Sequence, residues 1–308
     1  MKTLKRAILD TPIIDHHAHN LLQPSKTSRY NLLSITSEAS GPALDTTKSS
    51  LAHHKAVKQL SEALNCRPTW EAVEAGIAVR RKESPETWAK QCFAGIETVL
   101  IDDGLDPDDV HPFDWHDRLV RSPCKRIVRI ERVVEDIVLT MRSSKNFEVS
   151  EAVENLKNTF DKAIVDAVND PRVAGFKSVI CYRTGLDVQS YPQEAVRDVL
   201  TSLLENARDS KFRLQHEVAN PYFLHFAVGI LKRMGSKKPL QFHTGLGDND
   251  INLRLSNAAY LQTFIKDYPE VNIVLLHASY PYTMEAGYLA TVYPNVYLDI
   301  GEVFPQIR

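Results

Sequence analysis

Residues 11–19 read TPIIDHHAH, an apolar run that ends in a cluster of histidines. In an extended strand alternate side chains share a face, so Asp15, His17 and His19 point one way and His16 the other. Two imidazoles two residues apart can bind a single divalent cation, and neutral imidazole suits zinc, iron or manganese. A polar strand end would show the same pattern, so a metal site is predicted only if further ligands follow other strands.

The rest of the chain alternates between short apolar runs and helical patterns. Six further strands are predicted at residues 96–101, 126–130, 173–180, 239–242, 271–276 and 296–300, and helices at about 148–168, 192–208, 258–268 and 283–292. Strands that alternate with helices indicate a parallel sheet with crossover helices. We therefore predict an α/β fold, a (β/α)8 TIM-type barrel that lacks its eighth strand, with residues 1–308 as one domain.

A helical insertion is predicted after the first strand, at about residues 45–92. Its three segments begin at Ser50, at the pair Pro68-Thr69, and at Ser84 followed by Pro85. Serine at the N-cap and proline at the first helical position both favour the start of a helix. We expect this insertion to serve as a lid or as a contact between subunits, the latter making the protein a homo-oligomer.

Composition narrows the functional classes. The 308 residues are 43% hydrophobic and 25% charged, with a formal net charge of −2, as is ordinary for globular proteins. This balance gives no reason to expect nucleic acid or a membrane surface as a partner, and no apolar run approaches the roughly 20 residues of a membrane helix. The four cysteines have no short paired spacing, so we expect reduced thiols in a cytoplasmic protein.

Two further histidines stand where the metal prediction needs them. His243 follows the strand 239–242, and His277 follows the strand 271–276. Each is the first strongly polar side chain after an apolar run, and in a barrel the carboxyl ends of the strands form the active-site face. A single histidine at such a place is more often structural. Four histidines at matched positions on three strands favour a metal site.

Lys177 and Arg183 are candidates for contact with an anionic substrate. Lys177 lies inside the apolar strand 173–180, where an amine is costly unless it is paired or chemically changed. It could orient a substrate carboxylate or, as a carbamate, bridge two metals; a lysine that extends to the barrel end is the structural alternative. Arg183 follows the same strand and could bind a carboxylate, or equally form a surface salt bridge.

The pattern Asp15-x-His17-x-His19, together with Lys177, His243 and His277, resembles the amidohydrolase superfamily of metal-dependent barrels. More narrowly, the chain resembles the amidohydrolase-type domain that precedes a glutamine-synthetase-like domain in FluG-type fungal and nodulin-like plant proteins. This narrower likeness is carried by residues 11–15, 33–36, 50–53, 95–100, 175–178, 242–245 and 299–302.

The resemblance implies a metal-dependent hydrolase. His17, His19 and His243 would hold the metal, most readily zinc, with manganese or iron as alternatives, and Lys177 would join a second metal site. His277 would orient or polarise a small carboxylated substrate while metal-bound hydroxide attacks a C–N or related bond. Members of the family also carry an aspartate at the end of strand eight, which shuttles the proton, and we expect this sequence to lack it.

Two alternatives follow from the same residues. Without the strand-eight aspartate, the chain could be a catalytically incomplete regulatory or scaffolding domain that keeps the histidines. Some barrels of this superfamily use the same metal site to decarboxylate their substrate. A Rossmann-like binding protein is disfavoured, because histidines follow the first strand where a glycine-rich phosphate loop would stand.

Overall fold

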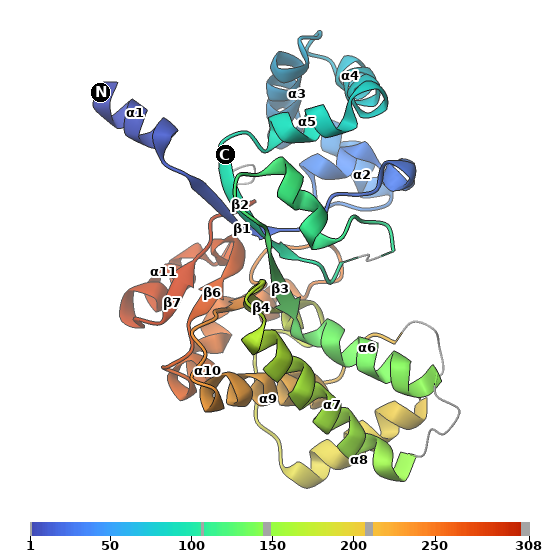
Figure 1. The fold of residues 1–308 in the computed structure, drawn as a ribbon, viewed down its shortest axis with the longest axis vertical. Helices are drawn as coiled ribbons and strands as arrows, with labels where there is room; N and C mark the ends of the chain where they lie inside the picture. The colour runs from blue at the N-terminus through green and yellow to red at the C-terminus, as the bar shows by residue number, and fades with distance from the viewer. Residues whose placement is uncertain (1, 106–107, 144–148, 207–211, 303–308) are drawn as a thin grey trace. The chain divides into compact units, whose positions relative to one another are not determined.

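The computed structural model describes residues 2–105, 108–143, 149–206 and 212–302. Its seven strands follow one another in chain order in one sheet, as they do in a (β/α)8 barrel without its eighth strand (Figure 1). The strands are β1 (Ile13–Ala18), β2 (Ile96–Asp102), β3 (Lys125–Arg129), β4 (Val173–Ser178), β5 (Leu240–Phe242), β6 (Ile273–Leu275) and β7 (Val296–Leu298). The predicted fold class is confirmed, and each predicted strand is present.

The chain divides into two compact units, which meet in sequence between Arg126 and Ile127. The division falls inside β3, so the first unit contains β1 and β2 and the second contains β4 to β7. We describe each unit by itself. The single domain that the sequence predicts stays a prediction.

The first unit joins a parallel strand pair to a helical segment. α1 (Lys2–Asp10) precedes β1, which pairs with β2, and the insertion contains α2 (Pro42–Thr46), α3 (Leu51–Leu64), α4 (Trp70–Glu83) and α5 (Pro85–Cys92). Ser50 and Thr69 cap α3 and α4 by accepting hydrogen bonds from the backbone N–H groups of His53 and Ala72. The helices enclose a small apolar core of their own, so the predicted helical insertion forms where the cap residues place it.

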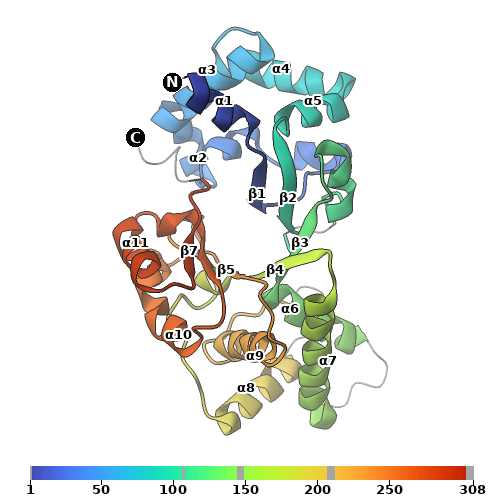
Figure 2. The same ribbon diagram turned by 60° about the vertical axis from the view of Figure 1, so that its left-hand side comes forward.

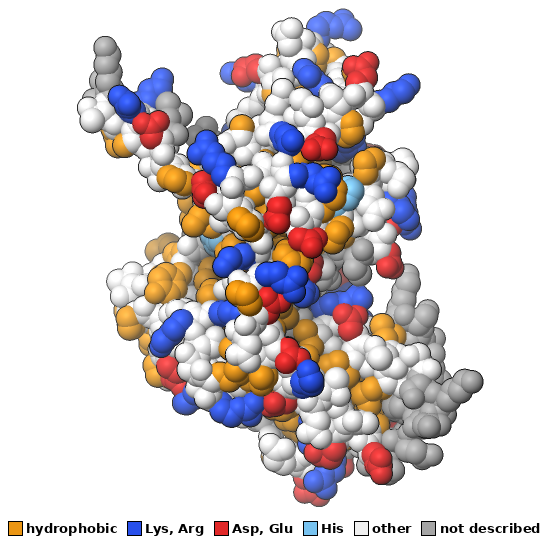
Figure 3. Space-filling view, viewed as in Figure 1, with side chains coloured by type: hydrophobic (Ala, Val, Ile, Leu, Met, Phe, Trp, Pro, Cys, Tyr) orange, Lys and Arg blue, Asp and Glu red, His pale blue; other side chains and the backbone are white. Residues whose placement is uncertain are grey.

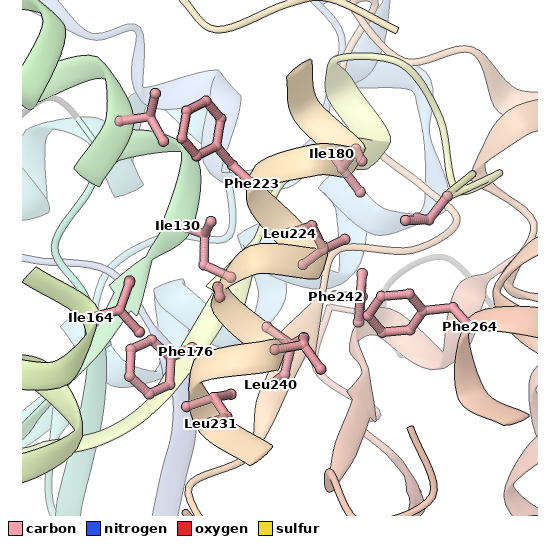
Figure 4. Packing of buried hydrophobic residues seen from close by; sticks show 14 of the residues in the cluster. Ile130, Ile164, Phe176, Ile180, Phe223, Leu224, Leu231, Leu240, Phe242 and Phe264 are labelled. Atoms are coloured by element: carbon pink, nitrogen blue, oxygen red, sulfur yellow. The ribbon is translucent and has the colours of Figure 1, made fainter. Parts of the chain in front are cut away.

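The second unit covers its four parallel strands with a larger set of helices (Figure 2). These helices are α6 (Ile130–Ser143), α7 (Val149–Asn169), α8 (Gln193–Asn206), α9 (Ala219–Arg233), α10 (Gln262–Asp267) and α11 (Thr283–Val292). One continuous hydrophobic core joins helices to strands, with Phe176, Phe223, Leu240 and Phe242 fully buried in it (Figure 4). The core holds the carboxyl ends of β4, β5 and β6 in register.

The two outermost strands of the sheet order expose large apolar side chains. Ile13 and Ile14 of β1 are 54% and 58% exposed, and Tyr297 of β7 is 52% exposed. Such exposure at both edges is what a barrel sheet shows where a neighbouring strand is missing. Elsewhere, acidic and basic side chains are interspersed on the face drawn in Figure 3. Within the described residues, none of the helices combines the length and apolar character that crossing a membrane requires.

Candidate metal centre

The second unit brings together the two histidines that end β5 and β6. The ring centroids of His243 and His277 lie 4.7 Å apart, and both side chains are buried. Their approach follows from the sheet register, because Phe242 is paired with Leu275 and the two histidines come one and two residues beyond that pair. The structure therefore places this half of the predicted cluster at the strand ends.

Backbone carbonyls fix the tautomer of each imidazole. His243 Nε2 lies 2.7 Å from Leu246 O, and His277 Nδ1 lies 3.2 Å from Gly301 O. A carbonyl oxygen only accepts hydrogen bonds, so these ring nitrogens carry the protons and the opposite nitrogens, Nδ1 of His243 and Nε2 of His277, carry the lone pairs. Metal-binding histidines in proteins are oriented by the same kind of outer hydrogen bond.

His277 occupies a left-handed turn. The φ angles of His277, Ala278 and Ser279 are 61°, 46° and 53°, a region that L-residues seldom adopt in succession. Asp299 holds this turn, since its Oδ2 accepts the His277 N–H at 2.9 Å and its backbone oxygen accepts the Ala278 N–H at 2.6 Å. Sequence reasoning gave Asp299 no role in the site. It could have been found by the rule used for His243, as the first polar residue after β7.

Lys177 lies in β4 at the level of Gln241, its partner across the β4–β5 pair, and only 2% of it is exposed. Burial lowers the pKa of His277, and the positive charge of Lys177 contributes to the same shift. A lowered pKa keeps this imidazole neutral near pH 7, the form that can bind a metal or donate a hydrogen bond to a substrate. The amine of Lys177 therefore acts electrostatically on His277.

The start of α6 supplies two buried carboxyl groups that hold the β4 end. Glu131 accepts hydrogen bonds from Ser178 Oγ at 2.6 Å and from the Val179 N–H at 3.0 Å. Burial raises the pKa of both Glu131 and Glu135. Both glutamates were missed from the sequence, because acidic residues near the start of a helix are common and carry no signal of burial.

Arg183 pairs with a buried carboxyl group, and its predicted role as a substrate ligand stays a prediction. Its guanidinium forms an ion pair with Glu135, at 3.1 Å between Nη2 and Oε1, and both side chains are largely buried. Tyr182, the preceding residue, instead lies against the histidines, with its ring centroid 4.4 Å from that of His243. Gly247 makes this packing possible, because a Cβ at that position would lie 2.6 Å from the Tyr182 hydroxyl.

The first unit carries the other two predicted ligands. The ring centroids of His17 and His19 lie 5.9 Å apart on β1, and His19 Nδ1 lies 3.0 Å from the backbone oxygen of Asp102 at the end of β2. The Asp102 side chain is buried, whereas that of His19 is 36% exposed. The prediction that His17 and His19 share an ion with His243 joins residues of both units and stays a prediction.

The comparisons with known proteins agree with these observations. Residues 215–307 match the family model described as amidohydrolase. Over this stretch the chain is similar to the amidohydrolase family. It contains His243, His277 and Asp299, so the family pattern covers the strand ends just described.

Two relatives extend the likeness to the whole chain. Protein fluG of Emericella nidulans is 42% identical over an alignment that covers 100% of this chain and 38% of the fungal protein. The chain thus spans less than half the length of this curated relative. A structure from Lactobacillus casei ATCC 334, provisionally assigned as a metal-dependent hydrolase, matches with a TM-score of 0.77 and 29% identity, over 96% of this chain and 75% of its own. The resemblance predicted from the sequence, to amidohydrolases and FluG-type proteins, is confirmed.

Proposed function

We propose that this chain is a metal-dependent hydrolase that uses a metal-activated water to cleave an amide-type C–N or related bond of a small carboxylated substrate. The observation that carries the proposal is the pair of buried imidazoles, His243 and His277, whose lone-pair nitrogens are selected by backbone carbonyls. The amidohydrolase pattern over residues 215–307 and the hydrolase assignment of the Lactobacillus relative support the same class.

The donor set fits a divalent ion of the zinc type. His243 would present Nδ1 to the ion, with His17 and His19 as the other predicted ligands. Zinc is favoured because imidazole is among its preferred ligands and because outer hydrogen bonds of the kind seen on His243 accompany zinc-bound histidines. A bound ion of this kind lowers the pKa of water from about 16 toward 7 and so supplies hydroxide near neutral pH.

The residues around the histidine pair would bind and orient the substrate. His277, held neutral by burial, can direct its imidazole toward a substrate carbonyl from the turn that Asp299 fixes. Lys177 supplies a buried positive charge for the substrate carboxylate, a role that its ammonium form performs without carbamylation. The ion pair with Glu135 favours Arg183 as a support of the β4 end rather than as a substrate ligand. A cytoplasmic location, favoured by four free thiols, is part of this proposal.

Metal analysis tests the first step. We expect wild-type protein purified from zinc-supplemented medium to hold stoichiometric metal by plasma mass spectrometry, and we expect His243→Ala and His17→Ala to lose most of it. His54→Ala is the matched control, because His54 is an exposed histidine on α3. Wild-type protein without bound metal, or full retention by His243→Ala, would contradict the proposal.

Substrate screening tests the second step. Metal-loaded protein should release amine from a panel of N-acyl amino acids, and chelation should abolish the release until zinc is restored. Lys177→Met should weaken turnover of carboxylated substrates more than that of their methyl esters. Release of carbon dioxide without amine would instead identify a decarboxylase, and metal-loaded protein inactive on both panels would contradict catalysis.

A further inference from the structure

A cavity lies on the outer side of the second unit, between the segment that precedes α8 and the outer face of α9. Its volume is about 510 Å³, which lies within the range of small-molecule sites in proteins. Tyr222, His225, Phe226, Gly229 and Arg233 line it from α9, at the spacing of a single helix face. The opposite face of α9, with Phe223, Leu224 and Leu231, packs into the core (Figure 4).

One wall of this cavity carries an ordered polar edge. His225 Nδ1 lies 2.8 Å from the Tyr268 hydroxyl, and His225 Nε2 lies 3.4 Å from Ser190 Oγ. Burial lowers the pKa of His225, so the ring is neutral near pH 7 and links the half-buried hydroxyl of Tyr268 to the exposed Ser190. A ligand at this edge would meet an oriented hydroxyl rather than one that must be fixed on binding.

A second wall is aromatic and unusually open. The rings of Tyr222 and Phe226, with centroids 5.8 Å apart and planes tilted by 47°, line the cavity next to Gly229, and we call this pair the aromatic shelf. A Cβ at Gly229 would meet no atom within 4 Å, so the space above this helical backbone is empty of side chains. Glycine in a helix interior costs about 1 kcal/mol relative to alanine. Core packing does not explain a glycine at position 229, because no other part of the protein approaches it. A flat ligand lying against the helix would explain it.

The lining offers an anion the remaining N–H donors of one guanidinium group. Arg233 is the one charged side chain that lines the cavity in the described part of the chain, and its Nη2 contact with Asp161 at 2.8 Å occupies one of the five N–H donors of the guanidinium. Burial raises the pKa of Tyr222 to about 12, which leaves its hydroxyl protonated and able to donate. Arg233 and Tyr222 can thus both donate hydrogen bonds beside the aromatic shelf.

We propose that this cavity binds a small planar aromatic carboxylate, with the ring on the Tyr222–Phe226 shelf over Gly229 and the carboxylate near Arg233. The site is independent of the histidine pair at the strand ends and does not rest on the proposed hydrolase activity. Aromatic stacking and a guanidinium–carboxylate contact are the two interactions that the lining offers.

Titration followed by saturation-transfer NMR tests the ligand class with three probes. We expect benzoate to bind the full chain saturably with a Kd of about 1 mM. Benzamide, which lacks the charge, and cyclohexanecarboxylate, which lacks the planar ring, should each bind about tenfold more weakly. Equal binding of all three probes, or no saturable binding of benzoate, would overturn the proposal.

Variants then locate the site. Gly229→Leu should fill the cavity and weaken benzoate binding about tenfold, whereas Gly287→Leu, at a helical glycine on α11 that is equally open, should not. Arg233→Gln should weaken benzoate but not benzamide, and Lys232→Gln, which removes a neighbouring exposed ion pair, should change neither. Circular dichroism confirms that each variant is folded. Unchanged benzoate binding by folded Gly229→Leu would place the probe elsewhere and refute the proposed site.

Discussion

The two units of this chain shift the pKa values of buried carboxyl groups in opposite directions. In the first unit the pKa of the buried Asp109 is lowered by a hydrogen bond from Tyr30 and the charge of Arg29, and burial lowers the pKa of His116, which is 1% exposed. The second unit also buries histidines, but burial raises the pKa values of its carboxylic acids Glu131 and Glu135. Acidification should therefore weaken the first unit, whereas a rise in pH acts against the acids of the second. The pH dependence of stability should therefore differ between the two units.

The largest effect is expected from the apolar cores, which also differ. The second unit has one continuous core, while the helical insertion of the first has a small separate one. Phe176→Ala should lower the free energy of unfolding by about 3–5 kcal/mol in urea titrations. Val73→Ala, in the insertion core, removes less apolar volume and should cost about 1–2 kcal/mol. A larger loss in Val73→Ala would reverse this ranking of the cores.

A smaller effect should appear on acidification of the first unit. His116 Nε2 accepts the Leu21 N–H at 2.9 Å, and a protonated ring cannot accept. Because the folded-state pKa is lowered, the unfolded chain binds more protons below 6.5, and stability is lost as pH falls through that value toward the folded pKa. On acidification we expect the wild type to lose about 1–3 kcal/mol of unfolding free energy through this group. His116→Gln should lose less, because glutamine can accept the hydrogen bond but does not titrate.

Urea titrations between about pH 5 and 8 measure this difference. The exposed His54→Gln is the control, and its pH profile should parallel that of the wild type. If His116→Gln shows the wild-type profile as well, the acid sensitivity of the first unit arises from other groups.

The smallest effect should have the opposite sign. The raised pKa of Glu131 means that the folded state retains a proton that the unfolded chain releases above 4.5, so its contribution to stability falls as pH rises. Glu131→Gln cannot release a proton and should gain on the wild type by on the order of 1 kcal/mol toward neutral pH. The same titrations follow it, with Asp136→Asn on the exposed part of α6 as control. If the stability of Glu131→Gln instead falls relative to the wild type as pH rises, Glu131 is ionised in the folded state.

The strands of both units could be predicted from sequence, because each is an apolar run that a polar residue ends. Three helices could not: α1, α6 and α9 went unpredicted. α6 starts at Ile130 directly after β3, so the strand pattern continues into it without a cap residue. α9 has Pro221 in its first turn and apolar residues on most faces, which hides its helical period.

The site shows the same division. His243 and His277 were predicted because a polar side chain directly after an apolar run is visible in the sequence. Glu131 and the ion pair of Arg183 were missed, because each depends on a contact across more than twenty residues. Asp299 was missed although it directly follows β7 and so meets the rule used for His243. An acidic side chain is buried when another element packs over it, and the spacing of residues near it in the sequence does not show this.

The left-handed turn at residues 277–279 bears on how this protein could be engineered. Three consecutive non-glycine residues with positive φ cost about 1 kcal/mol each, and glycine would remove the steric part of that cost. A redesign that optimises thermal tolerance alone would therefore select glycine at Ala278 early. The same change would make the backbone that orients the His277 ring more flexible. The strained turn thus lowers stability but fixes the position of the imidazole.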